Sequence, residues 1–121
     1  MKMNTVHTEE AIQRKLSGKY SELYPIYLKL RDEIFKFGEN IKIILFTIYL
    51  RIDFENDTFA VLFYRNGYLE LGLPTKKVHE RLECGKHLKW KQINKVIKLY
   101  SVEDIDDFVI NLLKEINSNR V

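Results

Sequence analysis

The chain has 121 residues, of which 45% are hydrophobic and 31% are charged, and its formal net charge is only +3. A second hydrophobic core would not fit in this length, and the balance of residues excludes the disordered and low-complexity classes. We therefore predict one α+β domain over residues 1–121, in which residues 1–20 are an N-terminal extension with a short helix.

Two helices are predicted in the first third of the chain. The first covers residues 8–16, with Thr8 as its N-cap. The second covers residues 21–37, where apolar side chains recur every three or four positions, Ser21 can cap the start and Gly38 can supply a left-handed stop.

The periodicity changes to that of strands beyond residue 40. Residues 41–54 are rich in β-branched and aromatic side chains and predict a strand that is interrupted near Thr47. Strands are also predicted over 58–65 and 68–73. Asn66-Gly67 between them is typical of a hairpin, because both central positions of a type I′ turn need positive φ.

The next segment predicts a short helix over residues 76–84 and a last strand over 93–100. Thr75 can cap this helix, in which Val78 and Leu82 would face inward. The strand predicted here would complete the sheet.

The most strongly patterned helix closes the chain. Ser101 to Asp104 resembles a capping box, and apolar residues then recur at helical spacing from Ile105 to Ile116. The expected architecture is an antiparallel meander sheet of about four strands, with helices packed on one face and a long C-terminal helix.

Compartment and membrane association can also be predicted. Cys84 is the sole cysteine, and no secretory leader precedes the first polar residues, so we expect a cytoplasmic protein without a disulfide. The most apolar run, residues 41–52, is far shorter than the roughly 20 residues of a membrane helix. We expect no membrane contact.

Several short runs together resemble a family of small prokaryotic domains of unknown function that often carry the label "predicted transport protein". The matching runs are His7 to Glu10, Leu16 to Gly18, Leu23 to Arg31 with Ile34 and Gly38, Phe59 to Val61, Leu69 to Leu73, Gly85 to His87, Lys89-Trp90, Val96 to Leu99, and Ser101 with Glu103 to Asp106. The resemblance implies a compact α+β domain and carries over no catalytic residue. The layout is also similar to the double-wing domains typified by YjbR, for which DNA binding has been proposed. In this chain Trp90 stands three residues after His87, whereas the family places the two side by side.

Positive charge is concentrated in residues 76–98. This segment holds eight basic residues against Glu80 and Glu83, so it carries +6 of a chain whose total is +3. Lysines and arginines bind phosphates, and aromatic rings among them can stack on bases. A solvated face is the alternative interpretation. The candidate residues for binding nucleic acid or an acidic protein are Lys76, Lys77, Arg81, Lys86, His87, Lys89, Trp90, Lys91 and Lys95.

A second hypothesis comes from the seven tyrosines. A sheet with helices on one face leaves the other face open, where Tyr49, Phe63, Tyr64 or Tyr68 could form a homodimer interface, a protein-binding surface or a small-molecule pocket.

Catalytic and metal motifs are weak. His79, Cys84 and His87 match no zinc spacing, and Cys84 lacks a nucleophile signature. The acidic residues 103–107 suit the first turns of a helix, and the carboxylates of residues 53–57 suit a hairpin turn better than a calcium loop. We predict no catalytic residue, metal or cofactor, and therefore a small binding or accessory module, with an undetected enzyme pocket as the weaker alternative.

Overall fold

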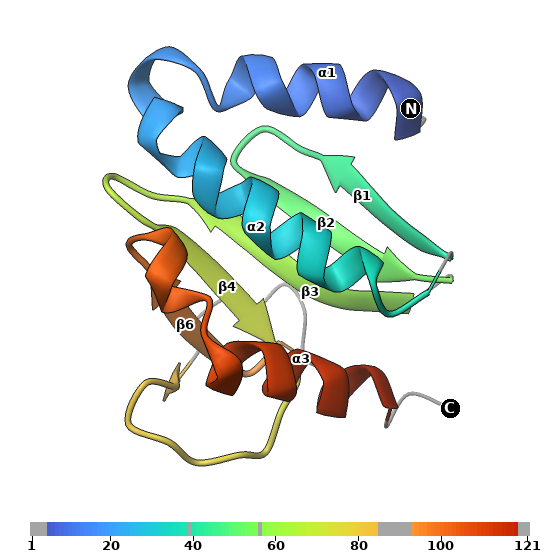
Figure 1. Cartoon of the computed structure of the whole chain (residues 1–121), viewed down its shortest axis with the longest axis vertical. Helices are drawn as coiled ribbons and strands as arrows, with labels where there is room; N and C mark the ends of the chain where they lie inside the picture. Colours follow the sequence, from blue (N-terminus) through green and yellow to red (C-terminus); the bar gives the residue numbers. More distant parts are fainter. Residues whose placement is uncertain (1–4, 39, 56, 85–92, 119–121) are drawn as a thin grey trace.

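The protein is a six-stranded antiparallel sheet with three helices on one face, as seen in a computed structural model (Figure 1). The structure describes residues 5–38, 40–55, 57–84 and 93–118, with the backbone alone for residues 5–8. The strand order is β1-β2-β3-β4-β6-β5. The predicted α+β class is confirmed, with more strands than the four expected.

The elements have the following bounds along the chain. They are α1 (Thr5–Lys15), the 3-10 helix η1 (Gly18–Leu23), α2 (Tyr24–Phe35), β1 (Ile41–Leu45), β2 (Tyr49–Phe54), β3 (Asp57–Tyr64), β4 (Leu69–Leu73), β5 (Glu83–Cys84), β6 (Lys95–Leu99), the 3-10 helix η2 (Val102–Asp104) and α3 (Asp107–Ser118).

The N-terminal residues belong to the core and are more than an extension. Helix α1 begins at Thr5, so Thr8 lies inside it and is not its cap. Ile12 and Leu16 are fully buried. Burial of two such side chains contributes roughly 3–6 kcal/mol of transfer free energy to the packing of α1 against the sheet.

The second predicted helix divides into η1 and α2. Ser21 lies inside η1, and Pro25 occupies the first turn of α2, where its missing N–H has no helical partner to lose. The helix ends at Phe35, and its buried residues Ile26, Tyr27, Leu30 and Ile34 follow the predicted spacing.

The first predicted strand is a hairpin of β1 and β2. The interruption expected near Thr47 is confirmed, and the Phe46 N–H donates to the Tyr49 carbonyl across it at 2.8 Å. The hairpin at Asn66-Gly67 is also confirmed, with the Arg65 N–H donating to the Tyr68 carbonyl at 2.9 Å. Only Gly67 has positive φ there, so the turn is not the predicted type I′.

The helix predicted over residues 76–84 is wrong. The segment has no regular structure before β5, because contacts outside it fix its backbone: the Thr75 N–H donates to Asn94 Oδ1 at 3.0 Å, and Asn94 Nδ2 donates to the Thr75 carbonyl at 2.8 Å. Val78, expected to face inward, is 88% exposed, whereas Leu82 packs against the core. Tertiary contacts here override local helix propensity.

The last helix begins later than the capping box predicts. Ser101 makes no side-chain cap bond, and residues 102–104 form η2. Asp106 caps α3 instead, because its Oδ1 accepts the Val109 N–H at 3.2 Å. The apolar stripe is confirmed: Ile105, Val109, Leu112, Leu113 and Ile116 are buried.

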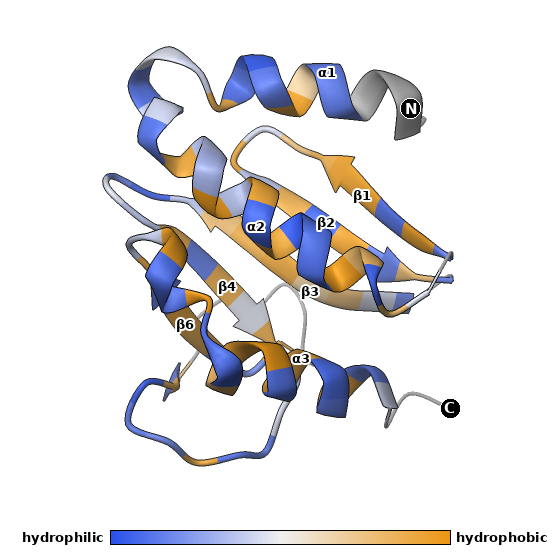
Figure 2. Cartoon of the chain, viewed as in Figure 1, coloured by the Kyte–Doolittle hydropathy of each residue, from blue (hydrophilic) through white to orange (hydrophobic). Residues whose placement is uncertain are grey.

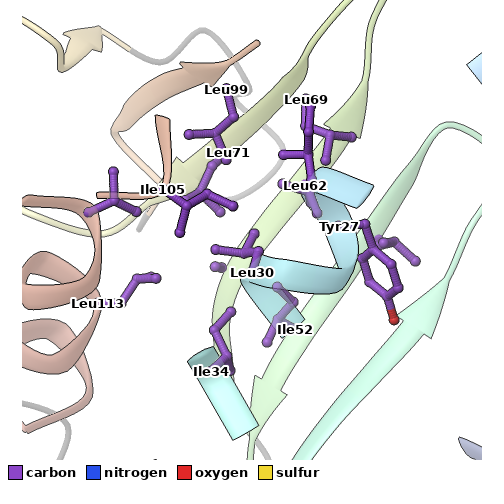
Figure 3. Close-up of a cluster of buried hydrophobic side chains, with 14 of the residues drawn as sticks. Tyr27, Leu30, Ile34, Ile52, Leu62, Leu69, Leu71, Leu99, Ile105 and Leu113 are labelled. Atoms are coloured by element: carbon purple, nitrogen blue, oxygen red, sulfur yellow. The ribbon is translucent and has the colours of Figure 1, made fainter. Parts of the chain in front are cut away.

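The main core lies between the sheet and the three helices. Hydrophobic residues make up most of the strands and alternate with hydrophilic residues along the helices (Figure 2), and the buried ones from both form one cluster. In Figure 3, Leu30 and Ile34 from α2 and Leu113 from α3 point toward strand residues such as Leu62 and Leu71. The register shift between Ile52 and Asp53 makes Phe59 a bulge residue, and it packs in this same core, so an aromatic ring is added to the helix-covered face.

Candidate binding surface

The centre of the predicted basic surface cannot be placed. Lys86, His87, Lys89, Trp90 and Lys91 lie outside the described residues. Their contribution to a binding surface stays a prediction, and the described members of the set provide the geometry.

Most described cations of this segment have partners nearby. Lys77 Nζ lies 3.6 Å from Glu115 Oε1, Arg81 Nη1 lies 2.8 Å from Asp106 Oδ2, and Lys95 Nζ donates to the Lys77 carbonyl at 3.0 Å. Lys76 is exposed, and no ion pair is found for it within the described ranges. These residues therefore do not converge on one uncompensated positive patch.

Arg81 and His79 attach the 74–82 segment to the start of α3. Arg81 Nη2 also donates to the Asp104 carbonyl at 2.9 Å, and the His79 ring stacks on Phe108 with a centroid separation of 4.0 Å. Partial desolvation would raise the pKa of Asp106, but bonds from the Val109 N–H and from Arg81, with the guanidinium charge, outweigh it and lower that pKa. These contacts hold the 74–82 segment against the start of α3.

The sheet face away from the helices has a different composition, and we call it the second face. Its small buried cluster consists of Tyr49, Val61, Phe63 and Ile93, with Phe46 packed against it. Gly72 lies opposite Val61 in the β3–β4 register, and a Cβ there would meet Ile93 Cγ2 at 2.7 Å and Val61 Cγ2 at 2.8 Å. Glycine is therefore needed for the close approach of Ile93.

Three cations on the second face each lie between an aromatic ring and a carboxylate. Arg51 Nε and Nη2 donate to the two Asp53 oxygens, both at 3.1 Å, and its Cζ lies 5.4 Å from the Phe46 ring centre. We call this arrangement, and the two described next, the second-face triplets.

The other two triplets lie nearer β6. Arg65 Nε donates to Glu70 Oε1 at 2.6 Å, and its Cζ lies 4.8 Å from the Phe63 ring centre. Lys98 Nζ lies 3.7 Å from Glu83 Oε1 and 5.5 Å from the Tyr68 ring centre. Each triplet combines a cation–π contact with an ion pair, so the charges within these three triplets balance.

The predicted aromatic set is only partly on this face. Tyr49, Phe63 and Tyr68 are, but Tyr64 lies under the helices, 5.7 Å from the Tyr20 ring. Tyr49 and Phe63 are 9% and 5% exposed, so they are buried and not presented to solvent.

On the second face, the exposed aromatic side chain among the described residues is Tyr100, which sequence reasoning did not select. Its side chain is 58% exposed and its ring lies 5.1 Å from that of Tyr68. The signal was present in the sequence, because Tyr100 continues the alternation of Val96 and Lys98 on one side of β6. Tyr68, Tyr100, Arg65 and Lys98 form what we call the tyrosine rim.

A notch lies beside the tyrosine rim, at the outer edge of β6. Strand β5 pairs with β6 only through Glu83 with Val96 and Cys84 with Lys95, so the ladder stops before Lys98. A cavity of about 290 Å³ is found there, lined by Arg81, Glu83, Ile97, Lys98, Tyr100 and Asp104. At its far end the Tyr100 N–H donates to Asp104 Oδ2 at 2.7 Å.

Two negative findings concern the described residues. Among them no group of three or more His, Cys, Asp or Glu side chains is placed to hold a metal ion, and none of their helices has the length and hydrophobicity needed to cross a membrane. Asp53, Asp104 and Asp106 all serve the ion pairs and caps described above.

Comparison with models of known protein families, with curated proteins and with solved structures gave no match. The resemblance to the prokaryotic domain family and to double-wing domains therefore stays a prediction, and the functional argument depends on the surfaces of this chain.

Proposed function

We propose that the protein is a non-catalytic protein-binding module whose tyrosine rim contacts its partner. The observation that carries this proposal is the exposed Tyr100 ring in a rim whose two cations, Arg65 and Lys98, already have carboxylates of their own. Tyrosine and arginine are enriched where proteins bind one another, and a charge-balanced face suits a protein better than a polyanion.

A second copy of this chain is the partner that the charge pattern favours. Cations and carboxylates alternate across the second face, and such a surface can be complementary to itself about a two-fold axis. Nucleic-acid binding is the competing outcome, because five candidate residues between Gly85 and Ile93 are not placed. We also propose a cytoplasmic location, which suits the exposed free thiol of Cys84.

Light scattering at increasing protein concentration tests the proposal. We expect the mass to rise toward that of a dimer, and we expect a Tyr68→Ser/Tyr100→Ser double variant to stay monomeric. Phe35→Ser is the matched control, because Phe35 is 43% exposed on α2, away from the second face, and it should dimerise as the natural chain does.

Fluorescence anisotropy with labelled single- and double-stranded DNA and RNA tests nucleic-acid binding, the competing hypothesis. Phosphate contacts would give an affinity that falls steeply with salt. A natural chain that is monomeric throughout and binds these probes at low salt would overturn the protein-binding proposal in favour of the basic segment.

A further inference from the structure

The hydrogen-bond pattern of the sheet identifies which backbone groups face the notch. In antiparallel pairs, successive residues direct their N–H and C=O groups alternately to the two neighbouring strands. The Arg65 N–H donates to the Tyr68 carbonyl, so Glu70 and Gly72 also bond to β3, and Leu69, Leu71 and Leu73 bond to β6.

The same alternation fixes the outer edge of β6. Lys95, Ile97 and Leu99 stand opposite the β4 residues that bond to them, so Val96 and Lys98 direct their backbone groups outward. Val96 meets Glu83 of β5. Across the described part of the chain, nothing is seen to bond the outward N–H and C=O of Lys98.

The ladder stops at this point for a local reason. Arg81 is the residue that would stand opposite Lys98 if β5 were longer. Its N–H instead donates to His79 Nδ1 at 3.1 Å, and Leu82 N–H closes a turn onto the His79 carbonyl at 2.9 Å. The chain therefore leaves the sheet edge, and the notch occupies the space where the strand would have continued.

We propose that the notch binds an extended peptide segment of a partner protein as an added strand along β6. One peptide residue opposite Lys98 would accept the Lys98 N–H and donate its own N–H to the Lys98 carbonyl. Its side chain would lie on the second face, because residues opposite each other in a sheet share a face.

The lining of the notch defines the chemistry of that peptide. The Lys98 ammonium group is already paired with the Glu83 carboxylate. The Arg81 guanidinium group already donates to the Asp104 carbonyl and to the Asp106 carboxylate, so neither cation needs an anionic ligand. The Tyr100 ring offers an open apolar surface. The residue opposite Lys98 is therefore apolar, and the volume of about 290 Å³ limits the segment to a few residues.

The other edge of the sheet is covered by a helix. The same alternation directs the backbone groups of Ile43 in β1 outward, yet this residue is only 3% exposed, and α1 packs against β1 (Figure 1). The cavity described above lies at the β6 edge.

A titration followed by ¹H–¹⁵N NMR tests this inference. The probe is the neutral peptide acetyl-Thr-Thr-Val-Thr-Thr-amide, and its control carries an N-methyl group on the valine. We expect the Lys98 amide signal to move with the first peptide, and the N-methylated peptide to bind about tenfold more weakly, as expected for one lost hydrogen bond.

Lys98→Pro and Lys98→Ala form the matched pair of variants. Both remove the lysine side chain, but only the proline removes the outward N–H, so Lys98→Pro should fold with the same unfolding midpoint as Lys98→Ala and bind the peptide about tenfold more weakly. Because the proline ring also fixes φ and restricts the preceding residue, a Lys98→Pro chain that fails to fold leaves the decision to the N-methylated peptide and the natural chain.

Equal binding of the peptide and its N-methylated form would overturn the inference, whatever the variants do. This inference does not depend on self-association through the tyrosine rim. If the chain dimerises but binds both peptides equally, the proposed function stands and the inference of peptide binding at the notch is wrong.

Discussion

The two faces of the sheet are built from different chemistry. The helix-covered face is an uncharged core of mostly aliphatic side chains such as Leu62, Leu71 and Leu99, none of which is more than 1% exposed. The second face combines rings with paired charges and leaves Tyr100 open. Stability is therefore expected to depend on the buried clusters of both faces, and binding on the edge and rim of the second.

Gly72→Ala is the substitution with the largest expected effect, because it overfills the one tightly packed place on the second face. The new Cβ would lie under 3 Å from side-chain atoms of Ile93 and Val61, which are themselves buried. We expect a loss of about 1–3 kcal/mol in the free energy of unfolding, measured by denaturant titration.

Gly38→Ala is the control, since the nearest atom to a Cβ at Gly38 is 3.7 Å away and the contact is ordinary. An equal cost for both substitutions would mean that packing on the second face does not constrain Gly72. The segment before β6 would then be able to shift and make room for the new methyl group. The second face would be less tightly packed than the helix-covered face.

The sequence predicts the helix-covered face well, because its signals are local and periodic. The stripe from Ile105 to Ile116, the hairpin at Asn66-Gly67 and the interruption near Thr47 all depend on residues close together in the chain. The bulge at Phe59, which packs this ring in the same core as Ala60, carries no such signal.

The second face was predicted less well, for a physical reason. Segment 76–84 looks helical by itself, but residues distant in sequence hold it in another conformation: Asn94 bonds the Thr75 backbone just before it, and Asp106 bonds the Arg81 side chain. The partners of Arg51 and Lys98 could not be named before the register was known. The notch arises from where β5 stops, and that depends on the His79 side chain.

A comparison of two tyrosines on the helix-covered face is expected to show a smaller effect. The Tyr27 hydroxyl donates to Glu9 Oε2 at 2.9 Å, whereas no hydrogen-bond partner is found for the buried Tyr64 hydroxyl among the residues that the structure describes. We expect Tyr27→Phe to cost about 1 kcal/mol, and Tyr64→Phe to be neutral or stabilising, in the same denaturant titration.

Alkaline titration gives an independent check of the same pair. Burial raises the pKa of Tyr64, and burial followed by the Glu9 carboxylate raises the pKa of Tyr27. A raised pKa in the folded state stabilises the fold below the unfolded value of about 10, and that stabilisation is lost as pH rises above it. Phenolate absorbance should therefore be the same for the natural chain and Tyr64→Phe until the chain unfolds.

The smallest expected effect is the coupling between Lys98 and Glu83, which a double-mutant cycle of alanine variants would measure. Their atoms are 3.7 Å apart, and the side chains are 35% and 55% exposed, so we expect about 0.2–1 kcal/mol, decreasing with added salt.

The matched cycle is Arg51 with Asp53, whose two 3.1 Å bonds and 10% exposed carboxylate side chain should give the larger coupling. The prediction concerns the order of the two coupling energies more than the size of either one. A coupling of Lys98 with Glu83 as strong as that of Arg51 with Asp53 would mean that the more exposed pair is held as firmly as the buried one, and that burial does not set the strength of the ion pairs on the second face.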